Sequence, residues 1–101
     1  MDPYARFTAA AAIVQTALSA ASAELAAIDD PATRLGAASE LVRLLRTEYE
    51  KAADARAVMA YIQWRDETIS QAAIGNRAGV TKGRASQIIR TGKEIVEGTT
   101  G

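Results

Sequence analysis

Residues 70–90 constrain the fold most, because they predict two short helices joined by a tight turn. Gly79 follows an apolar helical face and supplies the left-handed residue that a helix end and a sharp turn favour. Thr81 is a good N-cap for a second helix, in which apolar residues return at helical spacing. Gly75 is small enough for the two helices to cross at close range. The expected core positions here are Ile74, Ala78, Val80, Ala85 and Ile88.

Helical patterns also fill most of the chain before this turn, over residues 3–28, 32–54 and 55–67. The first ends at Asp29-Asp30-Pro31, because the residue before a proline avoids helical geometry. No glycine or proline lies near residues 52–54, so the sequence leaves open whether 32–67 is one helix or two.

We therefore predict an all-α fold, with a trihelical helix-turn-helix core and long N-terminal helical arms. The helix over 55–67 is the expected third member of that core, with Met59 and Ile62 packed on the turn. Thr91 and Gly92 mark the expected end of the last helix, and too few residues follow for a β-wing. The expected parts are a helical pair that serves dimerisation at 1–54, the helix-turn-helix domain at 55–93 and a flexible tail at 94–101.

The first helix carries a heptad pattern of apolar residues. We call this surface the N-terminal seam, and its large members are Phe7, Val14, Leu18, Leu25 and Ile28. So narrow a seam packs along another helix. The sequence leaves open whether that helix belongs to the same chain or to a second copy.

Composition excludes several classes of chemistry. The chain has no cysteine and no histidine, which removes disulfides, thiolate nucleophiles, histidine general bases and ordinary zinc sites. No nucleophile–base pair can be assembled, so we expect neither an enzyme nor a metal or other cofactor. Aromatic residues make up only 5%; so thin a core in a short chain favours helices that share burial with a partner chain.

Charge is balanced overall but unevenly distributed. The formal net charge is zero, yet the segment from Gln71 to Lys93 contains no acidic residue. Its basic residues are Arg77, Lys82, Arg84, Arg90 and Lys93. A local positive face is sufficient to attract phosphates.

The N-terminal region is apolar from Phe7 to Ala23, but Thr8, Gln15 and Ser19 interrupt the run. A secretory signal has a cleaner apolar block after a positive start, and alanine is too weakly hydrophobic for a typical membrane span. We therefore expect no membrane association and a cytoplasmic, nucleoid-associated protein.

In a helix-turn-helix the second helix enters the major groove by its N-terminal end, while the first crosses the phosphate backbone. The expected base contacts are Thr81, Lys82, Gly83, Arg84, Ser86 and Gln87. The expected backbone contacts are Ser70, Gln71, Asn76, Arg77, Arg90 and Lys93. Arginine and lysine suit guanine edges, and glutamine suits adenine. Gly83 would let the helix end approach DNA closely, although it weakens the helix by roughly 1 kcal/mol relative to alanine.

The segment from Ile69 to Ile88 resembles the sigma-factor region 4-like helix-turn-helix of small actinobacterial and actinophage proteins. The matching residues are Ile69, Ser70, Ile74, Arg77, Gly79, Val80, Gly83, Arg84, Ser86, Gln87 and Ile88. The segment from Asp30 to Arg34 and the alanine- and leucine-rich helix after it also resemble that group. Gly75, Thr81 and Ala85 depart from its usual alanine, serine and valine. The resemblance implies sequence-specific DNA binding in transcription control.

The sequence thus predicts a regulator that binds double-stranded DNA as a homodimer, with two recognition helices about 34 Å apart. The alternative is a helical adaptor that docks on RNA polymerase or on a recombinase or other mobile-element complex. The features that support this alternative are the neutral net charge and the excess of acidic residues in the part of the chain that contains the expected long helices.

Overall fold

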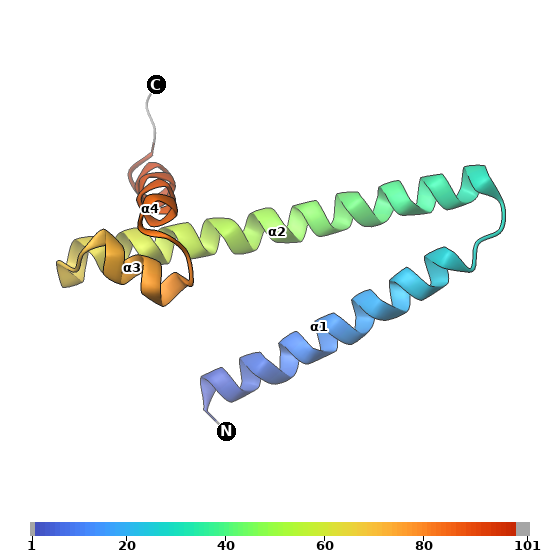
Figure 1. Cartoon of the computed structure of the whole chain (residues 1–101), viewed down its shortest axis with the longest axis horizontal. Helices are drawn as coiled ribbons and strands as arrows, with labels where there is room; N and C mark the ends of the chain where they lie inside the picture. The colour runs from blue at the N-terminus through green and yellow to red at the C-terminus, as the bar shows by residue number, and fades with distance from the viewer. Residues whose placement is uncertain (1, 99–101) are drawn as a thin grey trace. The chain divides into compact units, whose positions relative to one another are not determined.

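The computed structural model describes residues 2–98, and within that range it contains four α-helices and no strand (Figure 1). The helices are α1 (Pro3–Ala26), α2 (Pro31–Glu67), α3 (Gln71–Ala78) and α4 (Lys82–Glu97). The all-α prediction is confirmed. The chain divides into two compact units, Met1–Leu44 (unit 1) and Leu45–Gly101 (unit 2).

In unit 1, both helices begin at an aspartate and a proline. Asp2 caps α1 by accepting a hydrogen bond from the Ala5 N–H at 3.0 Å. Asp30 accepts from the N–H of Thr33 at 2.9 Å and from its hydroxyl at 2.7 Å. Both hydrogen bonds favour the ionised carboxylate, so they lower the pKa of Asp30. The first helix was expected to reach Ile28 and instead ends at Ala26.

The question of one helix or two over residues 32–67 is answered by α2, which is a single helix of 37 residues. After Gly36 the sequence of α2 offers neither glycine nor proline as a breaker. At its far end the chain turns through Thr68, which has φ 56°. Ser70 then caps α3, with its hydroxyl oxygen accepting from the Ala73 N–H at 3.1 Å.

Unit 2 contains all the buried apolar side chains among residues 2–98. They are Ala57, Ala60 and Tyr61 from α2, Ile74 from α3, and Ala85, Ile88 and Ile89 from α4. Ile69 and Val80 pack against this cluster. Of the core positions predicted around the turn, Ile74, Ala85 and Ile88 lie in the cluster, Val80 packs against it, and Ala78 is only partly buried.

Met59 and Ile62 were expected to pack on Ile74, Val80 and Ile88, but neither belongs to the buried cluster. Met59 is 50% exposed and Ile62 is only partly buried. The face of α2 that turns inward instead presents Ala57, Ala60 and Tyr61. Two small alanines on that face leave room for another helix to lie close to the α2 backbone.

The predicted helix end at Thr91 and Gly92 is also wrong, because α4 continues to Glu97 and is capped by Gly98. Gly92 is buried in the middle of α4, where an added Cβ would lie 2.0 Å from the Ala57 carbonyl oxygen. This glycine therefore permits a close helix crossing and does not end the helix. Residues 94–97 of the expected tail are helical, and residues 99–101 lie outside the described residues.

We expect Gly92→Ala to lower the free energy of unfolding by about 2 kcal/mol, because the new methyl group overpacks the crossing. Urea denaturation followed by circular dichroism measures this. Gly36→Ala is the matched control, since a Cβ at Gly36 meets nothing within 4 Å and alanine favours a helix. A Gly92→Ala protein as stable as the wild type would contradict the close crossing.

Candidate nucleic-acid interface

The turn between α3 and α4 has the backbone geometry predicted for it. Gly79 is left-handed, with φ 71° and ψ 33°. The Val80 N–H donates to the Gly75 carbonyl oxygen at 2.9 Å, which closes the end of α3. An added Cβ at Gly75 would lie 2.8 Å from the Val80 carbonyl oxygen, so glycine lets the turn fold tightly over α3.

Thr81 begins α4 as predicted. Its backbone is extended, and its Oγ1 accepts a hydrogen bond from the Arg84 N–H at 3.1 Å. The hydroxyl therefore stabilises the helix start and keeps its own proton to donate elsewhere. Lys82, Gly83 and Arg84 form the exposed first turn that follows this cap.

The rest of α4 has a buried face and an outward face. Ala85, Ile88, Ile89 and Gly92 are buried. On the opposite side of α4, four exposed residues recur at helical spacing and so lie in one line along the helix. We call it the outward stripe, and it consists of Gly83, Gln87, Arg90 and Glu94. Ser86 lies at its edge and is partly buried.

Gly83 differs from the other glycines of unit 2 helices because no contact explains it. A Cβ added at Gly83 meets nothing within 4 Å, whereas one added at Gly75 or Gly92 would collide with a backbone carbonyl oxygen. Gly83 therefore weakens the helix relative to alanine, and no packing contact within the described residues requires a glycine there.

The basic side chains around the turn fall into two groups. Lys82, Arg84, Arg90 and Lys93 are exposed and make no ion pair within the described part of the chain. The guanidinium of Arg84 donates to the Gln87 side-chain oxygen at 3.0 Å, so these two predicted base-contacting residues are held together.

Arg77 belongs to the second group, because its guanidinium is already bound. It donates to Glu67 at 3.1 and 3.2 Å and to the Gln63 side-chain oxygen at 2.8 Å. The hydrogen bond and the charge of Glu67 raise the pKa of Arg77. The contact joins α3 to the end of α2. Its partners lie 10 and 14 residues before Arg77, so helical periodicity does not predict the pairing.

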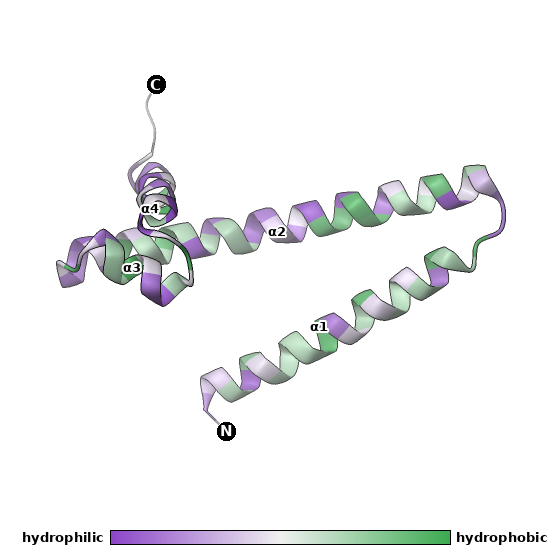
Figure 2. Cartoon of the chain, viewed as in Figure 1, coloured by the Kyte–Doolittle hydropathy of each residue, from purple (hydrophilic) through white to green (hydrophobic). Residues whose placement is uncertain are grey.

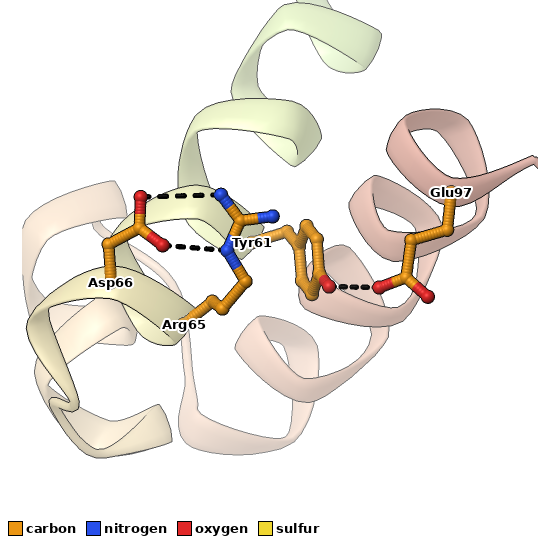
Figure 3. A network of polar contacts seen from close by, with 4 residues as sticks. All are labelled: Tyr61, Arg65, Asp66 and Glu97. Carbon is orange, nitrogen blue, oxygen red and sulfur yellow. Dashed lines mark hydrogen bonds and ion pairs between the residues drawn. The ribbon is translucent and has the colours of Figure 1, made fainter.

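A polar network, which sequence reasoning missed, holds the far end of α4 (Figure 3). The Tyr61 hydroxyl donates to the Glu97 carboxylate, and the Arg65 guanidinium lies 5.2 Å from the centre of the Tyr61 ring. Arg65 also pairs with Asp66 at 2.6 Å. The hydrogen bond to Glu97 and burial raise the pKa of Tyr61. These contacts link the last turn of α4 to α2.

The remaining predicted backbone contacts lie on α3 and its cap. Ser70 and Asn76 are exposed, and Gln71 is partly buried in the first turn of α3. Ser70 uses its hydroxyl oxygen as the cap acceptor. These side chains are uncharged, so the free positive charge of the region comes from α4.

The N-terminal seam lies in unit 1, where hydropathic colouring shows apolar residues along the whole of α1 (Figure 2). Phe7 is 63%, Val14 56% and Leu18 37% exposed. Leu25 and Ile28 are partly buried and line a shallow hollow with residues 37–44 of α2. By length and composition alone, α1 could also cross a membrane, a test that signal sequences and core helices of soluble proteins pass too.

Comparisons with protein-family models, curated proteins and solved structures found no match to this chain.

Proposed function

We propose that this protein is a sequence-specific DNA-binding regulator of transcription that acts as a homodimer. In this proposal α3, the turn at Gly79 and α4 form a wingless helix-turn-helix similar to sigma-factor region 4, and α4 reads the major groove. Because the proposed ligand is double-stranded DNA, the proposed location is the nucleoid in the cytoplasm.

One observation carries the proposal: the first turn of α4 combines an unpacked glycine with unpaired cations on either side. Gly83 has open space above it, and Lys82 and Arg84 flank it with exposed charges. Because Gly83 has no side chain, the backbone of this turn can approach base edges closely. The flanking cations can then neutralise phosphates or bind guanine. A purely structural helix would gain stability from alanine at this position.

The residues further along α4 extend this surface. Gln87 follows Gly83 on the outward stripe and is held by Arg84. This pair presents donors and acceptors suited to adjacent guanine and adenine edges. Ser86 and the Thr81 hydroxyl are the smaller polar groups at the edge of the same surface. They complete the proposed base contacts.

Phosphate contacts come from both sides of this surface. Arg90 and Lys93 supply them from α4, and Ser70, Gln71 and Asn76 from α3. Arg77 contributes only when a phosphate competes with Glu67 for its guanidinium. DNA binding by Arg77 thus requires the exchange of one anionic partner for another.

A second candidate function is the protein adaptor that docks on RNA polymerase or a recombinase complex. The observation that favours it is the exposed apolar surface of α1. The two candidates differ in salt dependence, because DNA affinity falls steeply with salt and apolar contacts do not.

The site is tested by Arg84→Ala and Lys82→Ala, with binding measured by fluorescence anisotropy on duplexes selected from a random library. We expect Arg84→Ala to weaken specific binding by about 10- to 100-fold and to relax selectivity. Lys82→Ala should reduce affinity and the slope of log affinity against log salt.

Arg46→Ala and Lys51→Ala are the matched controls, because both residues are exposed on α2. They should leave affinity and salt slope unchanged. The site assignment fails if the α4 variants bind like these controls.

Gly83→Ala separates a DNA-facing role from a structural one. We expect it to raise the free energy of unfolding by up to about 1 kcal/mol. Its methyl group should also weaken binding to the selected duplex by about tenfold, since it holds α4 away from the groove. Gly36→Ala should change stability alone. Unchanged DNA affinity in a more stable Gly83→Ala protein would contradict the close approach.

Glu94 limits how far along α4 the DNA can lie, because its exposed carboxylate shares the outward stripe. We expect Glu94→Gln to raise affinity for selected and unselected duplexes by about 2- to 5-fold at low salt, through lost repulsion. The exposed Glu50→Gln in α2 is the control. Equal affinities for both variants and wild type would show that DNA does not approach the C-terminal half of α4.

A further inference from the structure

Unit 1 lacks a core of its own. Among residues 2–44 no side chain is buried. Its large apolar residues that are exposed include Tyr4, Phe7, Ile13, Val14, Leu18, Leu35, Val42 and Leu44. Most helical stability in proteins comes from packing of an apolar face, and here those faces are open.

The two helices of unit 1 cannot cover these faces by packing on each other alone. Leu25 of α1 and Ile28, just after the end of α1, line a shallow hollow together with Leu41 and Leu44 of α2. Leu35 and Val42, spaced by one heptad, lie about 100–120° round the α2 axis from Leu41. They remain 70% and 56% exposed. An additional partner is needed to bury this second face and the open part of the N-terminal seam.

The chemistry of the seam limits what that partner is. From Phe7 to Ala23 the chain carries no charged residue, so the seam offers nothing to pair with phosphates or with an acidic or basic peptide. Its partner surface must be apolar, uncharged and spaced for a heptad helix. The seam of a second copy of this chain has these properties.

A lipid bilayer also offers an apolar surface, but α1 carries a polar stripe beside the seam. Thr8, Gln15, Ser19 and Ser22 recur at helical spacing, so they share one face. In a single span these groups would face hydrocarbon. In a helix bundle they face water while the seam is buried.

We infer that unit 1 is completed by unit 1 of a second copy, with α1 and residues 31–44 of each chain forming a four-helix bundle. This deepens the proposed function, because it assigns the surface of the homodimer that brings two α4 helices to one DNA site. The association itself is measured without DNA, so its failure is distinguishable from failure of DNA binding.

The test compares neighbouring residues of α1 in the full chain, by sedimentation equilibrium without DNA. Val14 lies on the seam, whereas Ile13 is 70% exposed and lies about 100° away from it. Wild type and Ile13→Glu should both have twice the 10.7 kDa chain mass. Val14→Glu should raise the dimer dissociation constant by about 100-fold or more, because a charge would be buried.

Three further measurements keep the inference falsifiable. Leu18→Ala should weaken dimerisation in the same direction even if Val14→Glu loses helicity by circular dichroism, and Arg84→Ala should remain dimeric. A wild-type monomer at micromolar concentration, or equal effects of Val14→Glu and Ile13→Glu, would overturn the inference. Flotation of the wild type with phosphatidylcholine–phosphatidylglycerol vesicles would overturn it in favour of a membrane.

Discussion

The close crossing of α4 over α2 at Gly92 is the constraint on which the rest of unit 2 depends. No side chain fits between Gly92 and the Ala57 carbonyl oxygen, and Tyr61 then reaches Glu97 in the last turn. With that crossing fixed, Ala85, Ile88 and Ile89 turn inward. The opposite face of α4, beginning with Gly83, is left open to a ligand.

The two units solve the problem of a thin core differently. Unit 2 uses small residues to bring helix backbones together, so few large side chains are required. Unit 1 has larger apolar residues but nothing within residues 2–44 that buries them. We propose that unit 2 recognises DNA and that unit 1 joins two copies of the chain, because the few free cations of one copy limit its affinity for DNA.

Local features were predictable from sequence because local chemistry determines them. The cap at Thr81 and the left-handed Gly79 follow from residue type and spacing, as does the all-α class. Gly92 was misread because a glycine that ends a helix and one that allows a crossing look the same in sequence. The pairing of Arg77 with Glu67 and of Tyr61 with Glu97 depends on tertiary packing, so no periodicity indicates it.

The most direct test of DNA recognition by α4 is an amide NMR titration of the full chain with duplex DNA at low salt. We predict that the largest chemical-shift changes on adding DNA fall on residues 81–87, with smaller changes in α3 and none in α1. Shifts confined to α1, or no shifts around the Gly79 turn at saturating DNA, would contradict it.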